Sequence, residues 1–179
     1  MFISCSKSLL TYLFITILFS TTAYSVIVTD IEVDGNNRIS NETIKMFSNI
    51  KIGNDLDESD LNEILKKIYD TNYFEDVSVK FKDGKLKISV KENPIIENIN
   101  YNGVKSDTLI KNITKNLNLR SRSSYNEILL KKDKELILSA LKEEGYYFSE
   151  LVIDVIDLKE NKVDLNFEIE LNDKAKIKK

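Results

Sequence analysis

The sequence contains no histidine and no tryptophan, and its only cysteine is Cys5. The lack of histidine removes the commonest general base and metal ligand, which excludes Ser-His-Asp and Cys-His catalysis and zinc fingers. The five glycines form neither GxGxxG nor GxxxxGKS/T, the two glycine-rich patterns that cradle phosphates. We therefore expect a protein that is not an enzyme and that requires no cofactor or metal ion.

An excess of basic charge is also missing. The 26 lysines and arginines face 29 aspartates and glutamates, which gives a pI of about 5.2. Proteins that bind the phosphate backbone of nucleic acids carry a clear basic excess, so we expect no nucleic-acid partner. The 42% of hydrophobic and 31% of charged residues indicate a globular chain that can bury a core in one or two domains.

The one long apolar run, residues 9–19, follows a single cation at Lys7. It is shorter than the roughly 20 residues that cross a bilayer, and the small residues Ala23 and Ser25 form an A-x-A-like cleavage pattern. We predict that residues 1–25 are a cleaved secretory signal peptide and that the mature chain begins at Val26, without any thiol. An uncleaved membrane anchor is the alternative.

After the predicted cleavage site, the chain contains the order strand, helix, helix, strand, strand twice. In the first copy, the β-branched residues of 26–35 predict a strand, and Ser40 is placed to cap a helix. A second helix carries an apolar stripe at helical spacing, formed by Leu61, Ile64, Leu65, Ile68 and Tyr69. Residues 77–81 and 86–90 alternate on either side of Asp83-Gly84, which predicts a β-hairpin.

The second copy begins at Pro94, the only proline, which marks the junction between the copies. We predict a strand over 95–103, a helix over 108–116 and a loop over 119–126. A long helix that ends at Gly145 carries Leu129, Leu136, Ile137, Ala140 and Leu141. Residues 151–158 and 163–169 form the second hairpin. The predicted domains are 26–93 and 94–172, and 173–179 is the start of a third domain or a tail.

Strict alternation in the strands, together with one-sided helical stripes, predicts that each sheet buries one face under two helices. The fold class is therefore α+β. Each copy is a three-stranded mixed sheet covered on one face by two helices.

Two clusters have competing interpretations. The acidic run 54–60 lacks the loop pattern of an EF-hand calcium site, which favours a helix start stabilised by the helix dipole. The aromatic residues 73–74 and 146–148 resemble a ligand platform, but their position between the second helix and the second strand favours packing in the core.

Several segments resemble the POTRA (polypeptide-transport-associated) domains of BamA-type outer-membrane assembly proteins. They are IEVDGN at residues 31–36, YDTNYFEDV at 69–77, VKENPII at 90–96 and GYY at 145–147. The resemblance covers the whole predicted mature chain, in the order of POTRA domains 1 and 2.

The resemblance implies a periplasmic arm that helps to fold β-barrel proteins and insert them into the outer membrane. The implied partners are unfolded outer-membrane β-barrel proteins, periplasmic chaperones and other subunits of the assembly machinery. In this family the chain continues through further POTRA domains into a transmembrane barrel, so contact with the membrane is expected only through such a barrel. The expected location is the periplasm, at the outer membrane.

Three other functions compete with this one. Within the family, the arm of a two-partner secretion protein or of another barrel-assembly homologue is the nearest alternative. A cell-division structural module of POTRA type is a second, and a carboxylate-dependent hydrolase is a third.

The connectivity also predicts a binding surface. If strand three of each copy lies between the other two, strand two is left at an edge, where unpaired backbone groups can accept an incoming extended segment. The predicted docking edges are Asp76, Val77, Ser78, Val79, Lys80, Phe81 and Lys82 in the first copy, and Leu151, Val152, Ile153, Asp154, Val155, Ile156 and Asp157 in the second. Val77, Val79 and Phe81 are expected to face the helices.

Overall fold

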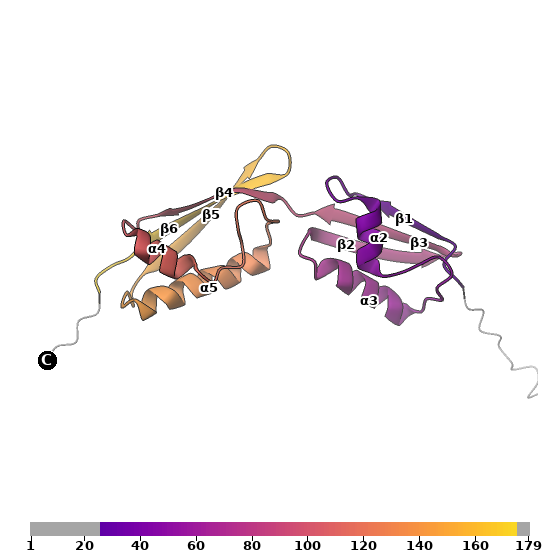
Figure 1. Cartoon of the computed structure of the whole chain (residues 1–179), viewed down its shortest axis with the longest axis horizontal. Coiled ribbons are helices and arrows are strands. Elements are labelled where there is room, and N and C mark those ends of the chain that lie inside the picture. The colour runs from indigo at the N-terminus through magenta and orange to yellow at the C-terminus, as the bar shows by residue number, and fades with distance from the viewer. Residues whose placement is uncertain (1–25, 175–179) are drawn as a thin grey trace, which may run out of the picture.

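The computed structural model describes residues 26–174, which form two units that lie end to end (Figure 1). The predicted signal peptide lies outside the described residues. The first unit comprises β1 (Asp30–Asp34), α2 (Asn41–Ser48), α3 (Glu58–Tyr69), β2 (Phe74–Lys82) and β3 (Lys85–Glu92). The second comprises β4 (Ile95–Asn102), α4 (Asp107–Thr114), α5 (Glu127–Glu143), β5 (Glu150–Leu158) and β6 (Lys162–Glu170). No helix within 26–174 has both the length and the apolar character that crossing a membrane requires.

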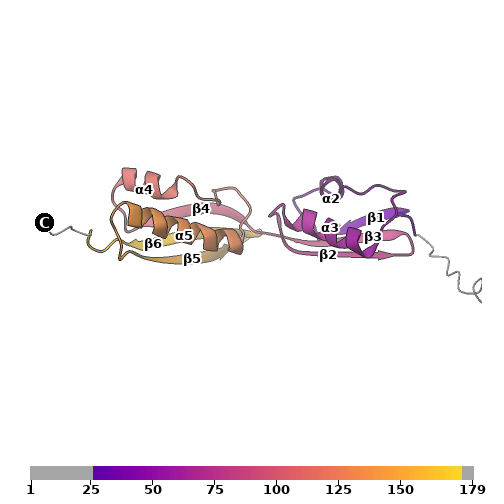
Figure 2. The same cartoon turned by 90° about the horizontal axis from the view of Figure 1, so that it is seen from below.

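The predicted α+β fold is confirmed in both units. The strand orders are β1-β3-β2 and β4-β6-β5, so the third strand of each unit is central. It pairs in parallel with the first strand and antiparallel with the second. The two helices of each unit cover the same face of its sheet, and the opposite face is open to solvent (Figure 2).

Local chemistry determines where several elements begin. The Ser40 hydroxyl accepts from the amide of Thr43 at the start of α2. Asp57 and Asp60 form a reciprocal capping box at the start of α3, so the acidic run is a helix start, as predicted. Asp83 and Gly84 both have positive φ angles, of 51° and 79°, which is the geometry that a two-residue hairpin turn requires.

Each unit has its own apolar core between sheet and helices. Ile44, Ile64, Ile68, Phe74, Leu86 and Ile88 are almost fully buried in the first, and Ile96, Ile113, Ile137, Leu141, Leu165 and Phe167 in the second. The predicted stripe of the long helix needs a correction. Leu136 is 40% exposed, and Leu130 and Asp133 are buried in line with Ile137 and Leu141.

The first strand is shorter than the predicted 26–35. Regular pairing begins at Asp30, because the Val28 backbone bonds to another segment: its amide donates to the Asn54 carbonyl, and its carbonyl accepts from Gly53. The predicted helix 108–116 is also shorter, spanning Asp107–Thr114.

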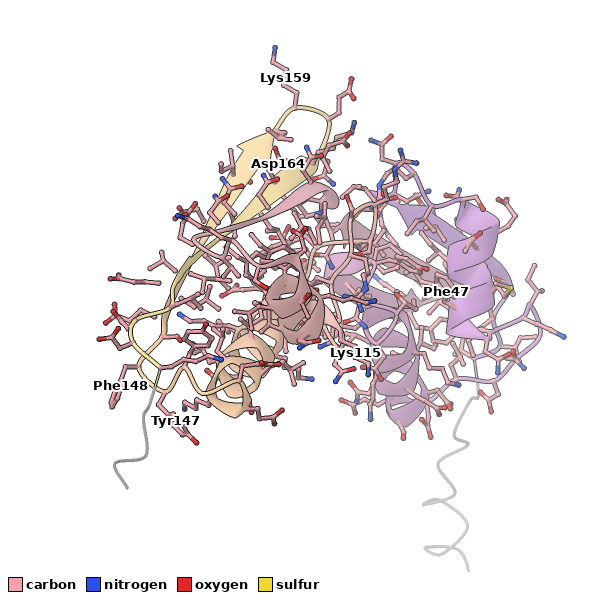
Figure 3. All side chains as sticks on the ribbon, turned by 60° about the vertical axis from the view of Figure 1, so that its left-hand side comes forward. Phe47, Lys115, Tyr147, Phe148, Lys159 and Asp164 are labelled. Carbon is pink, nitrogen blue, oxygen red and sulfur yellow. The ribbon has the colours of Figure 1, made fainter. Side chains whose placement is uncertain are left out.

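The aromatic clusters are only partly in the core. Phe74 is buried, whereas Tyr73 is 43% exposed and stacks on Phe47 with ring centroids 6.0 Å apart. Tyr147 and Phe148 are 57% and 73% exposed and project from the end of the second unit, so core packing was wrong for this pair (Figure 3). They lie in the turn after Gly145, beyond the last residue of α5, where no element covers them.

Candidate functional site

The strand order places β2 and β5 at sheet edges, as the connectivity predicts. Each strand has nine residues, and each pairs with a partner on one side only. Half of the backbone N–H and C=O groups of such a strand point away from the sheet and are available to another chain. Binding of a peptide at these residues stays a prediction.

The β2 edge is acidic at its start, at Glu75 and Asp76, and basic at its end. Val77 is buried, and Val79 and Phe81 are partly buried against the core, so these three face the helices as predicted. Lys80 and Lys82 lie on the solvent face, where they pair across the hairpin with Lys87 and Lys85. Lysines on an edge strand discourage pairing with other strands of the same kind.

The β5 edge is apolar and acidic. Leu151 is buried and Ile153 is partly buried, but Val152, Val155 and Ile156 are 58%, 38% and 44% exposed. Glu150, Asp154 and Asp157 supply the charge, and residues 150–158 contain no lysine or arginine. β5 therefore combines open backbone groups with apolar side chains and lacks the cations that protect β2.

Loops partly cover the opposite edge of each sheet. Residues 53–55 pair with residues 27–28 before β1, where Ile27 forms an antiparallel bridge with Asp55. At the start of β4, the Ile96 amide donates to the Ser123 carbonyl, and the Ile96 carbonyl accepts from Arg122. In both units a loop therefore shortens the open edge on the side of the first strand, and the longest open edges are β2 and β5. These loops were not predicted from the sequence.

Hydrogen bonds from both units hold the junction. The Asn93 amide donates to the Tyr73 carbonyl, and the Asn93 carbonyl accepts from the Arg38 guanidinium at 3.0 Å. On the other side, the Ile95 amide donates to the Asn161 carbonyl at 2.9 Å, and the Asn161 side chain donates to the Glu92 carbonyl at 3.1 Å. The connection therefore has a defined conformation.

Glu92, at the end of β3, fixes the turn after β1. Its side chain is 3% exposed, and Oε1 accepts from the amides of Asn37, Arg38 and Ile39 at 2.7–2.9 Å. Arg38 Nε lies 3.0 Å from Oε2 as an ion pair. Burial acts to raise the pKa of Glu92, but the three amides and the Arg38 charge outweigh it and hold the pKa below its usual value.

We expect Glu92→Gln to lower the free energy of unfolding of the first unit by about 2 kcal/mol at pH 7. Because the pKa of Glu92 is lower in the folded state than in the unfolded state, its ionised form stabilises the fold at pH values above the unfolded-state pKa. This stabilisation is lost as the pH falls through the folded-state pKa. The difference between variant and wild type should therefore shrink below about pH 4.5. Denaturant titrations at several pH values measure it.

Glu63→Gln is the matched control for that prediction, because Glu63 forms an exposed pair with Lys67 in the same unit. Exposed pairs contribute little, so this variant should stay close to wild type. A Glu92→Gln variant as stable as the control at pH 7 would contradict the assigned role.

The second unit has a buried carboxylate of its own, Asp133, at a different position in the fold. It is fully buried on α5, where its oxygens accept from the Asn118 amide and side chain and from the Leu119 amide at 2.7–2.8 Å. Burial, together with the negative charge of Asp133, raises the pKa of Tyr101 to about 12. Asp133 therefore fixes the loop after α4 against the core. Neither buried carboxylate was among the residues predicted from the sequence.

Two solved structures share this fold. The N-terminal domain of Omp85 from Thermosynechococcus elongatus superimposes with a TM-score of 0.56 at 14% identity, covering 82% of this chain and 63% of that one. POTRA1-2 of the periplasmic domain of Omp85 from Anabaena superimposes with a TM-score of 0.51 at 16% identity, covering 82% and 96%.

Two curated relatives are similar in sequence, and both are named outer membrane protein assembly factor BamA. The protein from Neisseria meningitidis serogroup B is 29% identical over 157 residues, which is 84% of this chain. The protein from Neorickettsia risticii is 27% identical over 153 residues, which is 77% of this chain. In each case the match spans 19% of the relative's length.

The family model of POTRA, described as a surface antigen variable number repeat, matches residues 26–93 and again residues 94–171. The two matches together cover both βααββ units and most of the chain. They agree with the fold shared with the Omp85 domains and with the sequence similarity to the BamA proteins, so the chain belongs to the POTRA family.

Proposed function

We propose that this chain is a non-catalytic periplasmic module that binds unfolded outer-membrane β-barrel proteins by β-augmentation during their assembly and insertion. The observation that carries the proposal is the pair of open edges, β2 and β5, each nine residues long. A transmembrane β-strand has about 9–11 residues. Each edge therefore has the length to pair with one strand of such a client.

β-augmentation suits clients that differ in sequence. Main-chain hydrogen bonds supply the affinity and are the same for every residue except proline, while alternate side chains add a weaker preference. Barrel strands share an alternation of apolar and polar residues rather than a sequence. A client strand on β5 can place its apolar side chains on the open face of the sheet, beside Val152 and Ile156, so we expect β5 to bind more tightly than β2.

The family and the relatives support a periplasmic location and a role in outer-membrane protein assembly. The curated relatives are named for outer-membrane protein assembly, and the solved Anabaena domains are described as periplasmic. The predicted signal peptide agrees with export. Periplasmic chaperones that deliver clients, and other subunits of the assembly machinery, are the further partners that we propose.

Proline scanning of the edges tests the proposal. We expect one variant of each neighbouring pair, Ser78→Pro or Val79→Pro in β2 and Ile153→Pro or Asp154→Pro in β5, to stay folded and bind an unfolded barrel peptide about fivefold more weakly at that edge. The reason is that proline removes one outward N–H, worth about 1 kcal/mol. NMR titration of the labelled chain measures binding at each edge.

Ser78→Ala is the matched control for β2, because it changes the side chain and keeps the amide. It should bind the peptide as the wild type does. Chemical-shift changes confined to the helices, together with unchanged binding by every folded proline variant, would refute docking at the edges.

A further inference from the structure

A cleft of about 440 Å³ lies at the junction of the two units. Its walls include Glu75 at the start of β2 and Val155 and Asp157 at the end of β5. Figure 2 shows β5 and β2 along the same side of the molecule, on either side of the junction. An extended chain that follows both edges therefore has to pass the cleft.

Much of the lining of the cleft is apolar or aromatic. Tyr69 from the last turn of α3 and Ile128 from the first turn of α5 line it and are 40% and 53% exposed. Tyr125 and Pro94 complete this surface. Aromatic faces attract cations, and apolar walls accommodate the methylene stem of a long side chain.

The rim carries negative charge only. Glu75, Glu127 and Asp157 line the cleft, and its lining within residues 26–174 includes no lysine or arginine. Glu75 and Glu127 each have a lysine partner outside the lining, at 2.8 and 2.7 Å, whereas Asp157 has no ion pair among the described residues. Burial and the charge of Glu127 raise the pKa of Tyr125, the charge of Lys131 acts against them, and the charge of Asp157 adds a smaller increase.

We propose that this cleft binds one basic side chain, arginine above all, of an extended polypeptide that lies along β5 and β2. Arginine matches the site because its planar guanidinium stacks on tyrosine and donates hydrogen bonds from its edge to carboxylates. The inference rests on the proposed function, since the edges hold the polypeptide. It adds a preference that main-chain pairing alone does not supply, because clients with a basic residue at the position that meets the cleft should bind more tightly.

Three synthetic peptides test the preference. Each has about 20 residues of alternating apolar and polar type, long enough at about 3.3 Å per residue to occupy parts of both edges. The first has one central arginine, the second has glutamine at that position, and the third carries the arginine at its end. We expect the first to bind the full chain about fivefold more tightly than the other two.

The end-placed arginine controls for attraction to the net negative charge, because it keeps the charge of the peptide and changes only its position. In the Glu127→Gln/Asp157→Asn double variant, the ratio of the affinities of the first two peptides should fall to about one. Glu143→Gln, at the exposed end of the same helix, should leave the ratio unchanged.

Three outcomes separate this inference from the proposed function. A fivefold preference that disappears in the double variant supports the cleft. Equal affinity of the three peptides, with NMR shifts in β2 and β5, overturns the cleft and leaves docking at the edges intact. Shifts in neither edge refute the proposed function, and the inference about the cleft falls with it.

Discussion

Replacing Asp133 by alanine is expected to lower the free energy of unfolding of the second unit by about 3 kcal/mol. The change removes three short hydrogen bonds to a fully buried carboxylate and leaves the Leu119 amide without its acceptor. Residue-resolved amide exchange of the whole chain measures the effect. Protection should fall across 95–171 and change little in 30–92.

Two further variants give this prediction its specificity. Glu135→Ala removes an exposed carboxylate from the same helix and should stay close to wild type. Asp133→Asn keeps the shape and one acceptor but places an NH₂ group where the Leu119 amide needs an oxygen, so it should recover only part of the loss. Protection of Asp133→Ala equal to that of Glu135→Ala would show that the carboxylate does not hold the loop.

Gly35→Ala is expected to destabilise the first unit by about 4 kcal/mol, the largest effect of a single substitution predicted for this chain. Gly35 has a φ of 81°, and an added Cβ would overlap the carbonyl oxygen of Val90 in the central strand. The backbone strain from the positive φ and the steric overlap with Val90 therefore both lower the stability of the variant. Thermal unfolding followed by circular dichroism measures the loss.

Gly53→Ala separates the two contributions. Gly53 also has a positive φ, of 95°, but an added Cβ there meets no atom within 4 Å. This variant should therefore lose only about 1 kcal/mol, from backbone strain. If Gly35→Ala and Gly53→Ala have the same stability, the contact between Gly35 and Val90 does not constrain the unit. The second unit repeats the arrangement, because a Cβ on Gly103 would overlap the Ile169 carbonyl oxygen.

The features predicted best from the sequence are those that depend on interactions between neighbouring residues. The cap at Ser40, the turn at Asp83-Gly84 and the junction at Pro94 each depend on a few neighbouring residues. The β-branched residues 26–29 have strand propensity, but their partner is a loop about 25 residues away along the chain, and no local pattern identifies it. The predicted strand was therefore too long.

The positions of the two buried carboxylates in the sequence carry signals of their burial. Glu92 continues the alternation of Leu86, Ile88 and Val90, so it was already on the core-facing side of its strand. Asp133 lies three residues after Leu130 and four before Ile137, within a helical stripe. The long helix offers overlapping stripes, one through Leu129 and Leu136 and one through Leu130 and Ile137. The structure buries the stripe through Leu130 and Ile137 in the core of the second unit.

The candidate edges were predictable because topology alone decides them, since a central third strand leaves the second outside. The cleft was not predictable, because its walls come from both units and depend on how the junction sets them side by side. The sequence shows that residues 69 and 125 are aromatic and that residue 157 is acidic. It does not show that these three side chains lie close together.

The loops that cover the starts of β1 and β4 have a consequence for the stoichiometry of binding. A sheet with two open edges is divalent: it can join two strands at once, and repeated pairing through such sheets grows into fibres. Here residues 53–55 pair with residues 27–28 ahead of β1, and residues 122–124 pair with the start of β4. Only β2 and β5 therefore offer an open edge of nine residues, and each unit has a valency of one for a strand of that length. Under the proposed function, a client strand bound at β5 or β2 would therefore end the pairing on the protein side and would keep its own far edge free for the next strand of its barrel.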